Sequence, residues 1–188
     1  MDKVIAGGAG QGTLSSYIPW LKIDSFSSRG VSRWIPGVKI HRPHQILSTG
    51  EANFLVLMEF NPRVLDIREQ FPITDYAATH RIAISKNITP AFYPGTKVPY
   101  VFTADFMLTI DNGQQGTYLE AYSIKYKKEL FELTDISRKR VFEKFEIERD
   151  YWGGKGISYR MIFAEDLPSI KVAKETPNKL PISRKWTA

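Results

Sequence analysis

The alternation of apolar and polar positions predicts a β-hairpin in the second half of the chain. Residues 100–110 (YVFTADFMLTI) and 117–127 (TYLEAYSIKYK) each have the apolar character of a strand. Asp111-Asn112-Gly113 between them is typical of a tight turn. Alternation along the second strand places Lys125 and Lys127 on the same face. Both lysines are therefore expected to point toward the neighbourhood of the first strand.

A helix is predicted to begin near Ser48 or Thr49, because either hydroxyl can cap a helix and an apolar run follows. Pro62 ends this helix. Thr49 is followed three positions later by Ala52, so no full capping box is predicted. Glu51 falls in the first turn, where the helix dipole favours a carboxylate. On local sequence alone, Glu51 is simply a good first-turn residue.

The other elements complete an α/β order. The segment before the helix, residues 16–50, is expected to form short strands and turns. A strand, a long loop, a helix that Asp135 could cap, and a last strand follow. They cover residues 64–73, 74–99, 129–152 and 157–164, with the hairpin between the loop and the helix. This order predicts a mixed sheet flanked by helices.

At 188 residues, the chain has the length of one domain. We expect a flexible, glycine-rich and serine-rich N-terminus over residues 1–15. A single domain would cover residues 16–166. Residues 167–188, which are basic and contain three prolines, would form a tail or linker.

Charge and composition narrow the functional classes. The net charge of +6 and the isoelectric point near 9.4 favour a polyanionic partner. The absence of cysteine excludes disulfides, thiolate zinc sites and a cysteine nucleophile. With only three histidines, any metal should be a hard ion held by oxygen, such as Mg²⁺ or Mn²⁺. No signal peptide or apolar membrane span is apparent, so we expect a soluble, intracellular protein.

Three polar residues have the makings of a catalytic site. Asp105 lies inside an apolar strand, where a charge is costly unless it is paired or bound to a metal. Glu51, Asp105 and Lys127 fall on neighbouring predicted elements. Two acids and a lysine in such an arrangement can hold Mg²⁺ and activate water against a phosphodiester. The alternative for Asp105 is a buried salt bridge to a lysine.

Other polar residues are candidates for contact with DNA. Lys125 and Lys128 would contact phosphate, and Arg68 and Gln70 at the end of a predicted strand could position DNA near the site. The alternative for Arg68 and Gln70 is a structural polar cluster with Asp66 and Glu69. For His44, a role in capping the turn before the helix is favoured over a phosphate contact.

Five short segments, in a specific order and spacing, carry a family resemblance. The most specific is Val64 to Pro72 (VLDIREQFP). The other four run from Gln11-Gly12 to Leu21, from His44 to Glu51, from Thr103 to Phe106, and from Glu146 to Trp152. With these segments the chain resembles the N-terminal nuclease domain of the TnsA family, the endonuclease subunits of heteromeric bacterial transposases.

The resemblance implies a restriction-endonuclease-like fold. Its active site would take an acid from a helix, an aspartate from a strand and a lysine from the next strand. By motif these correspond to Glu51, Asp105 and Lys127, with the backbone carbonyl of Tyr126 as a further Mg²⁺ ligand.

The resemblance also implies an activity and partners. The activity is cleavage of the 5′ strands of double-stranded DNA at transposon ends, with Mg²⁺ as cofactor and Mn²⁺ as a substitute. The partners are a transposase that cuts the 3′ ends and an AAA+ regulator, in the bacterial cytoplasm.

One departure from the family pattern favours the first of two alternatives, and the second rests on the fold alone. Relatives with this fold often carry Glu or Gln two residues before the lysine, and with Lys127 as the lysine that position is Lys125. A protonated lysine cannot ligate Mg²⁺. The alternatives are a catalytically weak DNA-binding or assembly module and a structure-specific nuclease that cleaves DNA junctions without a transposase.

Overall fold

A four-stranded mixed sheet forms the centre of the protein. In this computed structural model, residues 6–25 and 32–168 are described. The sheet has the order β3-β4-β5-β6, with β3, β4 and β5 antiparallel and β6 parallel to β5. Its strands are β3 (Val64–Pro72), β4 (Thr103–Asp111), β5 (Thr117–Lys125) and β6 (Ser158–Phe163).

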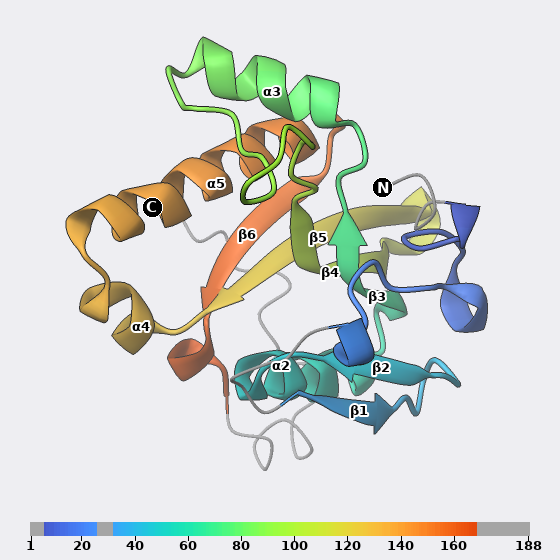
Figure 1. Cartoon of the computed structure of the whole chain (residues 1–188). Helices are drawn as coiled ribbons and strands as arrows, with labels where there is room; N and C mark the ends of the chain where they lie inside the picture. Colours follow the sequence, from blue (N-terminus) through green and yellow to red (C-terminus); the bar gives the residue numbers. More distant parts are fainter. Residues whose placement is uncertain (1–5, 26–31, 169–188) are drawn as a thin grey trace.

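Helices and a small ribbon cover both faces of this sheet (Figure 1). The ribbon pairs β1 (Arg33–Pro36) with β2 (Pro43–Ile46), and it lies with α2 (Thr49–Glu59) on one side. On the other side lie α3 (Tyr76–Ser85) and α5 (Asp135–Gly153), and α4 (Lys127–Glu132) joins β5 to α5. Short 3₁₀ turns complete the described elements: η1 (Leu14–Ser16), η2 (Ile23–Ser25), η3 (Gly113–Gln115) and η4 (Ala164–Asp166). The predicted fold, a mixed sheet flanked by helices as in restriction endonucleases, is confirmed.

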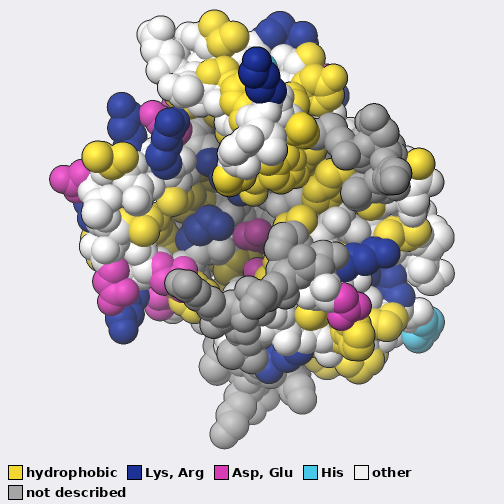
Figure 2. Space-filling view, viewed as in Figure 1, with side chains coloured by type: hydrophobic (Ala, Val, Ile, Leu, Met, Phe, Trp, Pro, Cys, Tyr) yellow, Lys and Arg dark blue, Asp and Glu magenta, His cyan; other side chains and the backbone are white. Residues whose placement is uncertain are grey.

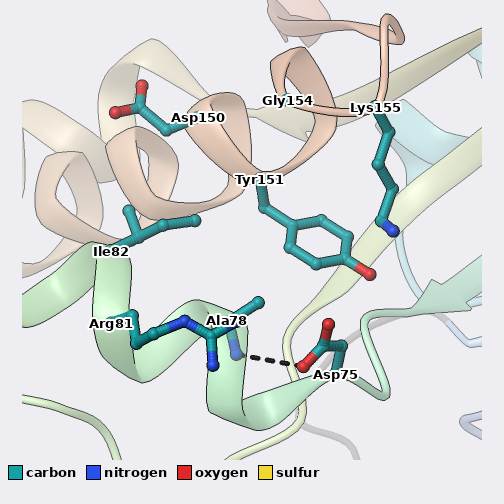
Figure 3. Close-up of a pocket in the computed structure, with 8 residues that line it drawn as sticks. All are labelled: Asp75, Ala78, Arg81, Ile82, Asp150, Tyr151, Gly154 and Lys155. Atoms are coloured by element: carbon teal, nitrogen blue, oxygen red, sulfur yellow. Dashed lines mark hydrogen bonds between the residues drawn. The ribbon is translucent and has the colours of Figure 1, made fainter.

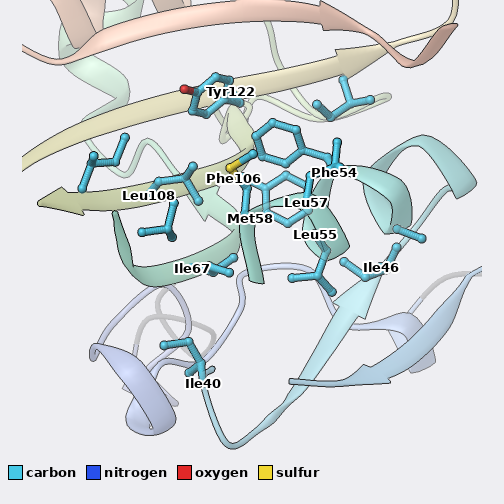
Figure 4. Packing of buried hydrophobic residues seen from close by; sticks show 14 residues of the cluster. Ile40, Ile46, Phe54, Leu55, Leu57, Met58, Ile67, Phe106, Leu108 and Tyr122 are labelled. Carbon is cyan, nitrogen blue, oxygen red and sulfur yellow. The ribbon is translucent and has the colours of Figure 1, made fainter. Parts of the chain in front are cut away.

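The larger core lies between α2 and the sheet (Figure 4). The ring of Phe54 on α2 has its centroid 5.0 Å from those of both Phe106 on β4 and Tyr122 on β5. Leu57 and Met58 on the same helix are also buried. Burial of each such side chain contributes about 1.5–3 kcal/mol, so α2 is fixed firmly against the sheet.

The start of α2 is set by a local cap. The Ser48 hydroxyl accepts a hydrogen bond from the Glu51 backbone amide at 3.1 Å, and the same hydroxyl donates to the Glu51 carboxylate at 3.1 Å. The prediction of a helix capped near Ser48 is therefore confirmed. Ser48 and Glu51 have the spacing of a capping box, but the Glu51 carboxylate accepts from the amide of Leu47 instead of that of Ser48.

The predicted long loop after β3 is wrong, because α3 occupies its first half. Asp75 caps α3 by accepting a hydrogen bond from the amide of Ala78 at 3.0 Å. The residues that α3 buries are small, chiefly Thr79 and Ala83. Its larger apolar residues Tyr76 and Ile84 are exposed, so the apolar positions in the sequence do not mark the buried face of this helix.

Two predicted boundaries around α4 are also wrong. The strand expected over 117–127 ends at Lys125, and Lys127 already begins α4. The helix expected over 129–152 is divided, because Thr134 starts α5 by accepting from the amide of Ser137 at 3.2 Å. Thr134, rather than Asp135, is therefore the cap.

Residues 6–15, which were predicted to be flexible, contact the sheet. The amide of Leu14 donates to the Asp66 carboxylate at 3.2 Å, and a Cβ on Gly10 would collide with Pro72. Slightly further along, the Tyr17 hydroxyl donates to the carbonyl of Glu69 at 3.0 Å. This N-terminal segment therefore lies along β3. The predicted basic tail lies outside the described residues, except for its first two.

A buried ionic cluster joins β2 to β3. The Glu69 carboxylate, which is fully buried, accepts from the Arg42 guanidinium at 2.6 and 2.7 Å and contacts His44 Nδ1 at 2.8 Å. His44 Nε2 lies 3.4 Å from the Glu59 carboxylate. Burial alone would raise the pKa of Glu69, but hydrogen bonds from Arg42 and His44 outweigh it and lower the pKa to about 2. The cluster is therefore an ion pair at neutral pH.

No helix in the described part of the chain is long and apolar enough to cross a membrane.

The ionic cluster makes Glu69 a strong stability determinant. We expect Glu69→Ala to lower the free energy of unfolding by about 3–5 kcal/mol at pH 7, because the buried Arg42 guanidinium loses its counterion. Because the pKa of Glu69 is lowered on folding, its contribution should be present above pH 4.5 and lost as the pH falls toward 2. Urea denaturation would measure this. As control, Glu132→Ala removes an exposed carboxylate and should cost under about 0.5 kcal/mol. Equal losses in the two variants would contradict the prediction.

Candidate active site

Asp105 is anchored at the centre of the candidate site. It lies on β4, and its carboxylate accepts hydrogen bonds from the Ile124 amide at 2.6 Å and the Ser123 hydroxyl at 3.3 Å, both on β5. Lys125, the last residue of β5, holds its amino group 3.9 Å from the same oxygen. The Asp105 side chain is 16% exposed, so one edge of the carboxylate faces solvent. Asp105 is thus fixed in place and still accessible.

Glu51 brings a second carboxylate from α2. It accepts hydrogen bonds from the Leu47 amide at 3.0 Å and the Ser48 hydroxyl at 3.1 Å. Burial and the negative charge of Asp105 raise the pKa of Glu51 to about 8. The two carboxylates are therefore close enough to repel each other in a partly desolvated place.

A glutamine completes the set of donors to Glu51. The side-chain amide of Gln70, near the end of β3, donates to the Glu51 carboxylate at 3.1 Å, and Gln70 is buried. The predicted contact between Gln70 and DNA does not fit this position. Gln70 instead touches the candidate acid directly.

Sequence reasoning missed Glu148 and Lys144 on α5. Glu148 is buried and accepts a hydrogen bond from the Tyr159 hydroxyl at 2.6 Å, and Lys144 lies 3.7 Å from it. Burial alone would lower the pKa of Lys144, but the charges of Glu148 and Asp105 outweigh it and raise the pKa. Glu148 falls at helical spacing with Phe145 and Trp152. An acid on the apolar face of a predicted helix indicates a buried charge, and this pattern could have pointed to Glu148.

These acids and lysines come together from four elements. Glu51 lies on α2, Asp105 on β4, Lys125 on β5, and Lys144 and Glu148 on α5. Figure 2 shows a hollow between the layer that contains α5 and the layer that contains α2, with basic and acidic side chains on its floor. In such a hollow, the lysines can bind a polyanionic substrate and the acids can take part in its reaction.

A separate pocket lies between α3 and the C-terminal end of α5 (Figure 3). Asp75, Arg81, Asp150, Tyr151 and Lys155 are among its lining residues. Its carboxylates are already engaged, since Asp75 caps α3 and Asp150 pairs with Lys86 at 2.8 Å. None of the acids or lysines of the candidate site lines this pocket.

The predicted position of Lys127 beside Asp105 is wrong. Lys127 begins α4, and its amino group forms an ion pair with Asp166. The carbonyl of Tyr126, predicted as a metal ligand, accepts the first hydrogen bond of α4 from Leu130 at 3.2 Å. Lys125 is the lysine that lies beside Asp105, because β5 ends at Lys125 and the chain enters α4 at Lys127.

The other predicted DNA contacts are distributed differently. Arg68 is buried, lies 3.3 Å from Asp66 and donates to Thr109 at 2.9 Å, so the structural alternative fits its contacts. His44 is fully buried in the ionic cluster, which excludes both a phosphate contact and a helix cap. Lys128 on α4 is 80% exposed, with Glu132 3.7 Å away, and it stays a candidate for phosphate contact.

The candidate site offers two carboxylates to a divalent cation, those of Glu51 and Asp105. Among the described residues, no group of three or more histidines, cysteines and acids could hold a metal ion. Two carboxylates converge, however, and Mg²⁺ commonly uses one or two carboxylates and keeps several waters. Burial and the charge of Asp105 raise the pKa of Glu51, and a cation between the two acids would offset both effects. Glu51 and Asp105 therefore fit a hard divalent ion completed by water.

The raised pKa of Glu51 predicts a pH-dependent stability. Because the folded-state pKa lies near 8, above the unfolded value of 4.5, Glu51 should reduce stability progressively as the pH rises from 4.5 to 8. Glu51→Gln removes this loss, so in metal-free buffer it should exceed the wild type at pH 8.5 by about 1–3 kcal/mol and match it near pH 5. Urea denaturation at both pH values measures the difference. The exposed Glu129→Gln serves as control, and parallel pH profiles for wild type and Glu51→Gln would refute the prediction.

Comparison with known proteins places the chain in a family. Residues 61–163 match the family model described as TnsA-like endonuclease N terminal, a range that includes Asp105 and Lys125 but begins after Glu51. The chain is also 35% identical, over 155 residues, to the Transposon Tn7 transposition protein TnsA of Escherichia coli. That match covers 82% of this chain and 53% of the relative, so the chain spans about half the length of that protein. The chain belongs to the TnsA-like family of endonuclease N-terminal domains.

Proposed function

We propose that this protein is a metal-dependent DNA endonuclease that cuts strands at transposon ends during DNA transposition. The observation that carries the proposal is the convergence of an acid on α2, an acid on β4 and a lysine on β5. The amino group of Lys125 lies 3.9 Å from Asp105, and the charge of Asp105 raises the pKa of Glu51. Membership of a family of endonuclease domains and the net charge of +6 support this function.

The residues divide the work of phosphodiester hydrolysis. Glu51 and Asp105 would hold Mg²⁺, or Mn²⁺ in its place. When bound, the ion would supply an activated water and neutralise charge on the phosphate. Lys125 stabilises the negative charge that builds on the phosphate in the transition state. Asp105 is already oriented for this by the Ile124 amide and the Ser123 hydroxyl.

With Lys125 as the active-site lysine, the departure noted in the sequence changes from a lysine to a serine, which still differs from the Glu or Gln of relatives. The position two residues earlier is then Ser123, which donates a hydrogen bond to Asp105 at 3.3 Å. A neutral hydroxyl there does not repel a cation. The reason for proposing a catalytically weak binding module is thereby removed.

The partners follow from the relative's described role. The matched relative is a transposition protein, and we propose that the present chain likewise acts on double-stranded transposon ends beside a transposase. Cleavage of the 5′ strands would complement 3′ cuts made by that partner. An AAA+ regulator is a further proposed partner of the complete machinery.

A matched pair of lysine variants tests the assignment of the site. Lys125→Ala should reduce strand cleavage by about 10²-fold or more, because charge in the transition state is no longer stabilised. Lys127→Ala should stay within about threefold of wild type, because it removes a half-exposed ion pair with Asp166. Strand-specific nicking of labelled transposon-end DNA, in Mg²⁺ with the cognate transposase, measures both. A larger loss in Lys127→Ala would reverse the assignment.

Asp105→Asn tests the nuclease itself. It keeps an oxygen that can accept from the Ile124 amide but removes the negative charge, so the domain should stay folded while 5′ nicking is lost. The 3′ cuts of the transposase in the same reaction are the internal control. Nicking by Asp105→Asn at the wild-type rate would refute the proposed site. Asp105-dependent cleavage of branched DNA without the transposase would instead identify a junction nuclease.

A further inference from the structure

Gln70 has an unusual backbone for a residue of its type in a strand. Its φ is +50°, in the left-handed region that favours glycine. Glu69 pairs with Phe106 and Phe71 pairs with Ala104, but the pair that would lie between them, Gln70 with Asp105, is missing from the ladder. Residues held in such conformations cost of order 1–3 kcal/mol, and they gather at functional sites.

Neighbouring contacts hold this conformation in place. The Gln70 carbonyl accepts a hydrogen bond from the Trp20 amide at 3.3 Å instead of pairing with β4. One residue earlier, the Glu69 carbonyl accepts from the Tyr17 hydroxyl at 3.0 Å. The N-terminal segment therefore replaces the ladder partner that β3 gives up at Gln70.

The exchange redirects the side chain of Gln70. In a regular antiparallel pair, Gln70 would stand on the same face as its cross-strand neighbour Asp105. Instead, its amide donates to Glu51 at 3.1 Å, on the oxygen that also accepts from the Leu47 amide at 3.0 Å. The other oxygen of Glu51 accepts from Ser48. Donors on three sides thus fix the orientation of the Glu51 carboxylate.

We infer that Gln70 is a positioning residue whose left-handed backbone exists to hold the Glu51 carboxylate beside Asp105 for a divalent cation. This inference rests on the proposed function. A neutral amide is suited to the task, because it orients a carboxylate without cancelling the negative charge that attracts the ion, whereas an arginine or lysine would compete with it. Gln70 does not touch DNA in this role.

Direct measurement of ion binding tests the inference without relying on cleavage. Mn²⁺ is titrated into the full chain, and the free ion is followed by its electron paramagnetic resonance signal. Gln70→Gly removes the amide and relieves the left-handed backbone. We expect its Kd for Mn²⁺ to rise about 10–100-fold, as for other residues that orient metal ligands. Its urea midpoint should change little, because backbone relief offsets lost side-chain contacts.

Two further variants keep the test decisive. Gln70→Asn tolerates the same backbone but has a shorter arm that cannot reach Glu51, so it should show the same loss of Mn²⁺ affinity, and it decides the matter if Gln70→Gly unfolds. Asn87→Gly relieves a comparable backbone, with φ of +55°, at an exposed position after α3. Its Kd for Mn²⁺ should equal that of the wild type.

Asp105→Ala separates failure of this inference from failure of the proposed function. If Asp105→Ala loses Mn²⁺ binding while both Gln70 variants bind within about threefold of wild type, Gln70 does not position Glu51 and the inference is overturned. If Asp105→Ala binds Mn²⁺ as tightly as wild type, the proposed metal site itself is wrong. Weaker binding by the Gln70 variants and by Asp105→Ala, with Asn87→Gly unchanged, supports both.

Discussion

Two carboxylates that repel each other, kept together in a partly desolvated place, are the constraint on which the site depends. Glu51 and Asp105 reach this place from different elements, and no described residue forms a close ion pair that would neutralise either of them. Burial and the charge of Asp105 raise the pKa of Glu51 to about 8. The rest of the fold holds them there. α2 is fixed by the contacts of Phe54 with Phe106 and Tyr122, and Asp105 is held by two hydrogen bonds from β5.

The same constraint explains how the cations are distributed. Lys125 stands 3.9 Å from Asp105, too far for a direct hydrogen bond, and it lies at the exposed end of β5. Lys144 approaches from α5, but Glu148 lies beside it. By contrast, the guanidinium of Arg42 is fully engaged with Glu69 in the ionic cluster. The close ion pair of Arg42 with Glu69 therefore stabilises the fold, whereas the carboxylates of Glu51 and Asp105 stay available to bind a cation.

Much of the fold could be predicted from the sequence, because α2, β3, β4 and β5 have strong apolar patterns and clear caps or turns. α3 could not, since it buries small residues such as Thr79 and Ala83 while its larger apolar residue Ile84 is exposed. The choice between Lys125 and Lys127 failed for a physical reason. Residues two apart on a strand share a face, so alternation cannot show where the strand ends. Glu51 and Asp105 could be singled out as candidates from the sequence. The backbone of Gln70 and the position of Glu148 could not, because they depend on tertiary contacts.

The contacts of the N-terminal segment have a consequence for the order in which the chain folds. Leu14 and Tyr17 bind Asp66 and Glu69, which lie 52 residues further along the sequence. Closing so long a loop costs entropy that only a preformed sheet can repay. Leu14 and Tyr17, which are synthesised before β3, are therefore expected to dock late, after β3 and β4 have paired. The left-handed backbone of Gln70 would then form among the last steps of folding. The sheet would therefore be complete before the Glu51 carboxylate is positioned.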